Sequence, residues 1–209
     1  STTALVGGNW YHIAITYVDG GAGASGTAKL YVNGVLEDTA TSVYSLATDV
    51  AITPALSGGG SNINYEGKMK DIRIYDSDLG ASNIAILSSQ MNKALGSPVG
   101  WWKLDEGTGT TVTNSGSVGS SDGTLTNGPT WTFNDFTSTL LPTMTEVDSL
   151  EVKSGVLDLD NRNYISLDGT DDVVKSSGST DIMNDKDATL SFWFKGASHG
   201  GGNTILESN

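Results

Sequence analysis

The sequence predicts an all-β fold, a jelly-roll β-sandwich of two antiparallel sheets with one short helix. Short runs of alternating apolar, β-branched and aromatic residues recur along the 209-residue chain, and clusters of Gly, Ser, Asn and Asp separate them. One segment has the three- and four-residue spacing of apolar residues that is typical of a helix. Many short strands with one helix favour a β-sandwich over a parallel α/β sheet.

The chain opens with a predicted strand and hairpin. Residues 10–18 alternate between two faces, and this pattern predicts a strand with His12 on the open surface of the sheet. Residues 29–36 contain Asn33 and Gly34, a pair that supplies the positive φ angles of a tight type I′ turn. A second strand and a hairpin are therefore expected here.

A strand over residues 63–75 precedes the predicted helix, which covers residues 79–95. Asp78 stands at the position of an N-cap, because its side chain can accept a hydrogen bond from the first turn. Residues 96–98, Gly-Ser-Pro, end the helix and mark the predicted boundary between two halves of the chain. The apolar residues that define the helix are Ile84, Leu87, Met91 and Leu95.

The strand pattern resumes after this boundary. Residues 107–127 form a tract rich in Gly, Ser and Thr, and residues 134–162 are expected to be an inserted hairpin or loop. The runs that predict strands are 99–104, 130–133, 164–167, 173–174, 189–194 and 204–206.

The composition disfavours several partners. The chain has 11 Lys and Arg against 24 Asp and Glu, which gives a formal net charge of -13. This charge repels phosphate backbones and anionic lipids, so we expect no nucleic-acid partner. No apolar run approaches the ~20 residues of a bilayer span, so we expect no membrane insertion. The absence of Cys excludes disulfides and thiolate metal sites.

Several motifs together resemble laminin-G-like domains of the concanavalin A-like lectin/glucanase superfamily. Residues 9–17 (NWYHIAITY) and 28–36 (AKLYVNGVL) resemble the central strand pair of these domains. Residues 67–76 (GKMKDIRIYD) resemble their last strand. The stretches that resemble their opening strands are 99–111 (VGWWKLDEGTGTT), 122–131 (DGTLTNGPTW), 165–174 (ISLDGTDDVV) and 190–195 (LSFWFK).

The order of these motifs departs from the family pattern. Residues 1–96 resemble the C-terminal part of a laminin-G-like domain, and residues 97–209 resemble its N-terminal part. The chain is then either a circularly permuted domain or a slice of a tandem array, with the end of one repeat and the start of the next. We expect the two halves to close on each other as one sandwich domain, because unpaired sheet edges promote aggregation.

A possible enzymatic motif lies in the inserted segment. Residues 146–151 (EVDSLE) resemble the E-x-D-x-x-E strand of laminarinases and lichenases in the same superfamily. The resemblance implies a glycoside hydrolase acting on β-glucans, with Glu146, Asp148 and Glu151 facing one cleft and the two reacting carboxyl groups roughly 5 to 5.5 Å apart. The alternative is an exposed acidic strand or loop, and we expect that the chain is not an enzyme.

Calcium is the metal ion that the sequence favours, because oxygen ligands abound, Cys is absent and the two His are far apart in the chain. By resemblance, Asp71 matches the acidic residue that often holds a structural calcium in this superfamily. Asp105 or Glu106 could assist, and Asp168 begins a second acidic turn. The alternative is that these residues only form turns.

Trp101 and Trp102 are the candidate ligand-binding residues. Neighbouring residues of a strand point to opposite faces, so one indole could stack on a sugar ring or be covered by the helix or the inserted loop. We therefore expect a non-catalytic carbohydrate-binding or adhesion module of a surface or virion protein. The alternatives are the glycoside hydrolase and a purely architectural repeat of a large surface or phage tail protein. The expected partners are a carbohydrate or a neighbouring protein surface, with self-association as a possibility.

Overall fold

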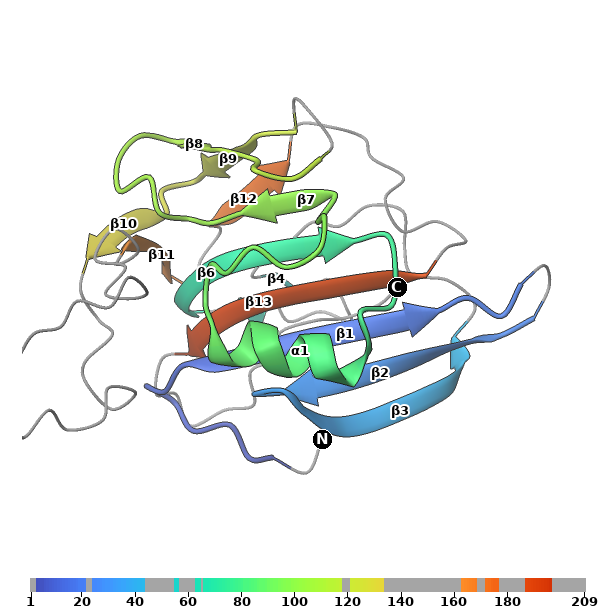
Figure 1. Ribbon diagram of the computed structural model, residues 1–209. Helices are drawn as coiled ribbons and strands as arrows, with labels where there is room; N and C mark the ends of the chain where they lie inside the picture. The colour runs from blue at the N-terminus through green and yellow to red at the C-terminus, as the bar shows by residue number, and fades with distance from the viewer. Residues whose placement is uncertain are drawn as a thin grey trace, which may run out of the picture.

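A computed structural model describes residues 3–21, 24–43, 55–56, 63–64, 66–117, 121–133, 163–168, 172–176 and 187–196. Within these residues the fold is mostly β with one helix, α1 (Gly80–Ser89), and it contains an eight-stranded and a three-stranded sheet (Figure 1). Every strand pair in both sheets is antiparallel. This confirms the predicted antiparallel β-sandwich with one short helix.

The eight-stranded main sheet contains strands from both halves of the chain. Its strands are β1 (Tyr11–Val18), β2 (Gly26–Val32), β3 (Val35–Val43), β6 (Glu66–Tyr75), β7 (Gly100–Trp102), β10 (Thr130–Phe133), β11 (Asn163–Asp168) and β13 (Ala188–Gly196). Their order is β10-β11-β6-β13-β1-β2-β3, and β7 also pairs with β6. The late strand β13 thus lies between the early strands β6 and β1 (Figure 1). Residues 1–96 and 97–209 therefore build one sheet, whereas the permuted order stays a prediction.

The core lies between the main sheet and the three-stranded sheet, which consists of β12 (Val173–Ser176), β9 (Gly123–Thr126) and β8 (Thr111–Val112). Val112, Leu125 and Val174 of the small sheet belong to one apolar cluster with Ile72 and Phe192 of the main sheet. A two-stranded ribbon, β4 (Ala55–Leu56) with β5 (Ile63–Asn64), completes the strands of the described part.

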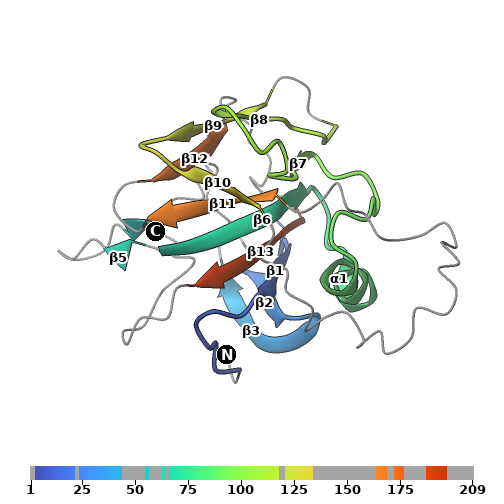
Figure 2. The same ribbon diagram turned by 90° about the vertical axis from the view of Figure 1, so that its left-hand side faces the viewer.

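The helix α1 covers the other face of the main sheet, called here the outer face. Its buried residues Ile84 and Leu87 form a second apolar cluster with Ala14, Tyr31 and Tyr75 of the sheet. In Figure 2, α1 lies to the right of the main sheet, and β9 and β12 lie to the upper left of that sheet. The molecule therefore has three layers: the helix, the main sheet and the small sheet. Among the described residues, no helix is both long and apolar enough to span a membrane.

The helix is shorter than predicted, spanning Gly80–Ser89 instead of 79–95. The predicted cap, Asp78, lies one residue before the structural cap position, and its carboxylate accepts a hydrogen bond of 2.9 Å from the backbone N–H of Gly80. Beyond the helix, Asn92 adopts a left-handed conformation (φ 56°) and turns the chain toward β7. Apolar spacing alone could not reveal this turn.

The hairpin between β2 and β3 is confirmed. Asn33 (φ 49°) and Gly34 (φ 81°) both have positive φ angles, as a type I′ turn requires. A Cβ on Gly34 would collide with the Ser88 hydroxyl of α1. Glycine is therefore needed here both for the backbone angle and for the close approach of the helix.

The prediction that His12 lies on an open sheet surface is wrong, because only 1% of its surface is exposed. β1 is a central strand with β13 on one side and β2 on the other. Its neighbours Ile13 and Ala14 lie in the core cluster and in the helix cluster, respectively. Alternation separates the two faces of a strand, but both faces are covered here, so it does not separate buried from exposed residues.

The Gly, Ser and Thr tract over 107–127 contains two strands that the residue pattern did not predict, β8 and β9, although β9 lies within the stretch 122–131 that resembles an opening strand of the family. Val112 and Leu125 are the large apolar residues that these short strands bury, and the flanking Thr111, Thr124 and Thr126 are exposed. Such small strands have too few residues to show a period. The predicted strand over 204–206 and the segment 134–162 lie outside the described residues.

Candidate functional site

A β-bulge in β6 places Asp71 on the outer face of the main sheet. The pairing of β6 with β13 changes register between Ser191 and Trp193, and Asp71 there adopts a left-handed conformation (φ 53°). Its backbone N–H leaves the β13 ladder and donates to the Lys103 carbonyl at 3.1 Å. Because the bulge adds one residue, Met69 and Ile72 both point into the core although they are three residues apart.

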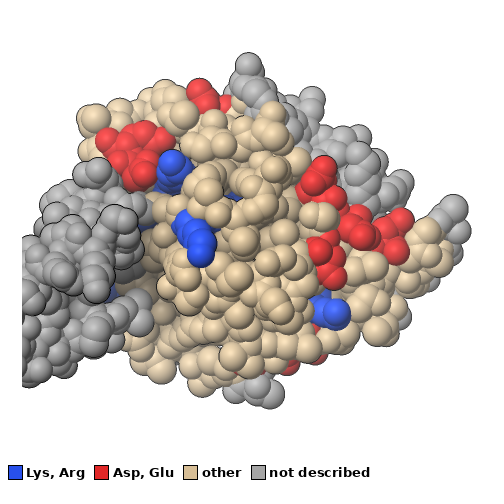
Figure 3. Space-filling view, in the orientation of Figure 1, with Lys and Arg blue, Asp and Glu red and all other residues tan. Residues whose placement is uncertain are grey.

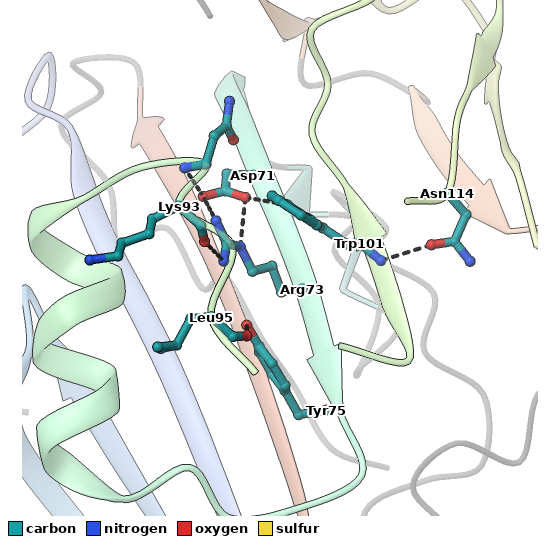
Figure 4. Close-up of polar contacts among 8 residues, drawn as sticks. Asp71, Arg73, Tyr75, Lys93, Leu95, Trp101 and Asn114 are labelled. Carbon is teal, nitrogen blue, oxygen red and sulfur yellow. Dashed lines mark hydrogen bonds and ion pairs between the residues drawn. The ribbon is translucent and has the colours of Figure 1, made fainter. Parts of the chain in front are cut away.

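The Asp71 carboxylate accepts four hydrogen bonds (Figure 4). Oδ1 accepts from Arg73 Nε at 2.8 Å and from Trp101 Nε1 at 2.7 Å. Oδ2 accepts from Arg73 Nη2 at 2.9 Å and from the backbone N–H of Asn92 at 2.9 Å. Asp71 and Arg73 are 3% and 1% exposed, so this is a buried, bidentate ion pair. Asp71, Arg73, Asn92 and Trp101 are called here the Asp71 cluster.

The Arg73 guanidinium makes two further contacts. Nη1 donates to the Lys93 carbonyl at 2.5 Å, and the guanidinium carbon lies 4.4 Å from the centre of the Trp101 ring. Burial works to lower the pKa of Arg73, but the hydrogen bond and the charge of Asp71 outweigh it, so the pKa is raised. The guanidinium therefore stays charged in the protein interior.

The Asp71 cluster joins the two halves of the chain. Lys93 and Asn92 belong to the connection that follows α1, whereas Trp101 belongs to β7 (Figure 4). Tyr75 adds a hydrogen bond of 3.1 Å to the Leu95 carbonyl, and burial raises the pKa of its hydroxyl. The cluster thus fixes the connection over residues 90–98 against β6.

Trp101 and Trp102 point to opposite faces of β7, as their alternation predicts. Trp102 lies in the core cluster, and its Nε1 donates to the Ser121 carbonyl at 3.0 Å. Trp101 lies on the outer face, and both the Arg73 guanidinium carbon and the Lys103 ammonium are close to its ring centre, at 4.4 and 4.7 Å. Only 9% of Trp101 and 6% of Trp102 is exposed, so neither indole offers an open face to a sugar ring.

The four candidate metal ligands are not brought together. Glu106 Oε1 accepts from the backbone N–H of Thr113 at 2.6 Å, and the carbonyl of Asp105 accepts from Asn163 at 2.7 Å. Asp168 ends β11, and its backbone N–H bonds to Asp172. Over the described ranges, no group of three or more His, Cys, Asp or Glu residues is placed to hold a metal ion.

The residues around Asp71 do not fit a calcium ion. Calcium takes six to eight oxygen ligands, but four N–H donors already occupy the Asp71 carboxylate. A cation there would face the positive guanidinium of Arg73 at hydrogen-bond distance from the same oxygens. The hydrolase motif, Glu146, Asp148 and Glu151, lies outside the described residues.

A second group of side chains, missed by the sequence analysis, lies on the outer face and is called here the aromatic row. It consists of Trp10, His12, Lys68, Tyr164 and Trp193, which come from the four adjacent strands β11, β6, β13 and β1 and from the residue before β1. Trp10 meets the Tyr164 ring edge-on at 5.5 Å between centres. Lys68 donates to the Tyr164 hydroxyl at 3.1 Å, and its ammonium lies 4.9 Å from the centre of that ring.

The buried polar atoms without a hydrogen-bond partner include Nδ1 of His12 and Nε1 of Trp193 in this row. These two residues are directly paired across β1 and β13, with ring centres 5.4 Å apart. Burial is the main cause that lowers the pKa of His12 to about 4; Asp71 opposes this and Arg73 adds to it. His12 is therefore neutral at pH 7, and either ring nitrogen can accept or donate according to its tautomer.

The charges on this side of the molecule are separated. In Figure 3, acidic side chains gather near both edges of the face that carries α1, and the few basic side chains stand apart from one another. Among the side chains that Figure 3 colours, there is no continuous basic patch of the kind that phosphate backbones require.

Comparisons with known proteins find a family resemblance for one part of the chain. No curated protein and no solved structure matches the sequence. A family model does match: Laminin_G_3, described as the Concanavalin A-like lectin/glucanases superfamily, matches residues 1–85, which include β1 to β6 and the first part of α1. The predicted resemblance is confirmed over this range, and beyond it the resemblance stays a prediction. Residues 1–85 are therefore similar to the concanavalin A-like lectin/glucanase superfamily.

Proposed function

We propose that this protein is a non-catalytic carbohydrate-binding module and that the aromatic row is its ligand site. The match of residues 1–85 to a lectin-like superfamily supports carbohydrate as the class of ligand. The row supplies aromatic rings, a cation and buried polar atoms on one sheet face. Protein sites for sugars combine apolar rings with a few polar groups that fix orientation.

The observation that carries this proposal is the pair of unpartnered atoms, Trp193 Nε1 and His12 Nδ1. Leaving a buried polar atom without a partner costs about 1–3 kcal/mol, so native structures usually supply one. The indole N–H is only a donor, whereas a neutral imidazole nitrogen can accept. A sugar hydroxyl both accepts and donates, so hydroxyl groups match this pair chemically.

The edge of the row gives access from solvent. Trp10 and Lys68 are partly exposed, whereas His12, Tyr164 and Trp193 are buried. A ligand would meet the Trp10 ring first, where stacking on an aromatic face is worth about 1 kcal/mol. Trp193 and His12 are 6% and 1% exposed, so their unpartnered atoms would reach a ligand only after the side chains that cover them move.

The proposal is for binding without turnover. His12 is neutral and buried, and Asp71, whose charge acts on His12, is committed to four donors. General acid–base catalysis needs a group that can exchange its proton at the working pH. Display outside the cell, on a cell surface or on a virion is the setting in which such a module meets glycans.

One observation favours the architectural alternative as a second candidate function. β3 is an end strand of the main sheet, and it carries Val35 and Leu36, which are 63% and 49% exposed. An exposed apolar edge strand can pair with another chain. A neighbouring repeat or a second copy of the protein would be the partner in that case.

A glycan array with a parallel assay for β-glucan hydrolysis separates the candidates. The proposal predicts binding without turnover. Turnover would support the hydrolase, and the absence of both binding and turnover would support the architectural role.

For a glycan that binds, Trp193→Phe should weaken binding about tenfold, because it removes the unpartnered N–H. The matched control is Trp131→Phe, since Nε1 of Trp131 already donates to the Gly109 carbonyl at 2.7 Å. Equal binding by both variants would contradict the site.

A further inference from the structure

Two turns of the molecule contain the pair Asn-Gly. Asn33 and Gly34 join β2 to β3, and Asn127 and Gly128 lie between β9 of the small sheet and β10 of the main sheet. All four residues have positive φ angles, 49° and 81° in the first turn and 67° and 109° in the second. Both Asn residues are exposed. The two turns therefore share their sequence, the sign of φ and contact with solvent.

An Asn-Gly pair can change its own covalent structure in water. The backbone nitrogen of the glycine attacks the side-chain carbonyl carbon (Cγ) of the Asn, and a bond forms between these two atoms. The Cγ–Nδ2 bond breaks, and the amide group leaves as ammonia with the proton of the glycine N–H. Water then opens the five-membered succinimide ring and leaves Asp or isoaspartate. Glycine permits the attack because no Cβ shields its nitrogen.

Contacts on two sides hold the first pair in place. Oδ1 of Asn33 accepts a hydrogen bond of 2.9 Å from the backbone N–H of His12, and the N–H of Asn33 donates to the His12 carbonyl at 2.8 Å. Gly34 packs against α1, where a Cβ on it would collide with the Ser88 hydroxyl and lie 3.1 Å from the Cα of Ala85. The Asn33 side chain can therefore swing against the Gly34 nitrogen only after the turn leaves β1 and α1.

The second pair has more space around its glycine. Gly128 is exposed, and the nearest described atom to a Cβ on it is Asp172 Oδ1 at 3.8 Å, which is an ordinary contact distance. We propose that Asn127 is a site of spontaneous deamidation and that the fold protects Asn33 from the same reaction. The inference is independent of carbohydrate binding.

The modification would alter both the charge and the connection between the sheets. Each product carries one more negative charge, in a chain whose formal net charge is already -13. Isoaspartate also adds one methylene group to the backbone between β9 and β10, which belong to different sheets.

Peptide mapping by mass spectrometry, after incubation of the whole protein at mildly alkaline pH, tests the proposal. In the folded protein we expect deamidation at Asn127 to be about tenfold faster than at Asn33, because Asn33 reacts only when its turn opens locally. In urea the two rates should become similar, since glycine follows both Asn residues. The measurement in urea thus separates protection by the fold from the effect of the local sequence.

The control variant is Asn127→Gln, because a Gln side chain must close a larger, six-membered ring. The peptide that contains its turn should show no mass increase over the period in which the wild-type peptide reacts. An equal increase in the variant would place the reaction at another residue and overturn the proposal. Equal rates at Asn33 and Asn127 in the folded wild type would also overturn it. So would an Asn127 that reacts in urea but stays intact in the folded protein.

Discussion

Two neighbouring regions of the outer sheet face differ in how their central polar groups are partnered. In the Asp71 cluster, four donors satisfy the carboxylate and Arg73 also binds the Lys93 carbonyl, although both amide atoms of Asn92 are buried without a partner. In the aromatic row, Trp193 Nε1 and His12 Nδ1 are buried without a partner. Both regions are rich in Trp and charge, so composition does not distinguish them. A satisfied cluster stabilises the fold, whereas an unsatisfied one is suited to receive a ligand.

The largest expected effect is a loss of stability when the ion pair of the Asp71 cluster is broken. Asp71→Asn removes the negative partner and leaves the Arg73 guanidinium buried without a counter-charge. We expect a loss of about 3–5 kcal/mol in the free energy of unfolding, measured by urea denaturation. Asp76→Asn, an exposed carboxylate at the end of the same strand, is the control and should change stability little. A loss below about 1 kcal/mol for Asp71→Asn would mean that the cluster does not hold the fold.

The next largest expected effect is the pH dependence of the free energy of unfolding that His12 of the aromatic row causes. The pKa of His12 is about 4 in the folded protein, below the ordinary 6.5, because burial favours the neutral form. The unfolded chain therefore binds the proton more readily between these values, and stability falls as the pH falls from 6.5 to 4. The loss approaches about 3 kcal/mol at the lower end of this window and is absent above it.

Unfolding free energies of the wild type and of His12→Gln across this window isolate the contribution of His12. The variant lacks the titrating ring, so its stability should fall less steeply between pH 6.5 and 4. Parallel pH profiles for the two proteins would mean that His12 is not held neutral by the fold.

The smallest expected effect is the difference in the free energy of unfolding between two matched Trp substitutions. Trp101→Phe removes a hydrogen bond to the charged Asp71, whereas Trp193→Phe removes an N–H that has no partner. Both substitutions remove the same atoms from buried sites, so the lost volume largely cancels between them. We expect Trp101→Phe to be the less stable variant by about 2 kcal/mol in urea denaturation. Equal stabilities would remove the distinction between the two regions.

Local sequence rules predicted much of the fold. The pair Asn33 and Gly34 fixed a turn, because only a few residue types accept two positive φ angles in succession. Alternation also predicted that Trp101 and Trp102 would point to opposite faces, as they do. These features depend on residues that are neighbours in the chain.

The candidate site depended on contacts that a local pattern cannot contain. Asp71 meets Trp101, 30 positions away, and Asn92, 21 positions away, and the bulge that brings them together is set by the register with β13. The resemblance assigned a calcium ion to Asp71, because a sequence motif does not show which side chains contact the carboxylate. In the structure, Arg73 donates to both oxygens of Asp71. His12 was misjudged because exposure depends on what covers a sheet, not on the strand itself.

The affinity of one bound glycan for the wild type and for Trp193→Phe, measured by isothermal titration calorimetry, tests the proposed role of the row most directly. Trp131→Phe serves as the reference, since its N–H is already satisfied within the protein. The account predicts that Trp193→Phe binds about tenfold more weakly than both other proteins while remaining folded. An unchanged dissociation constant for Trp193→Phe would contradict the assignment of the row as the carbohydrate site.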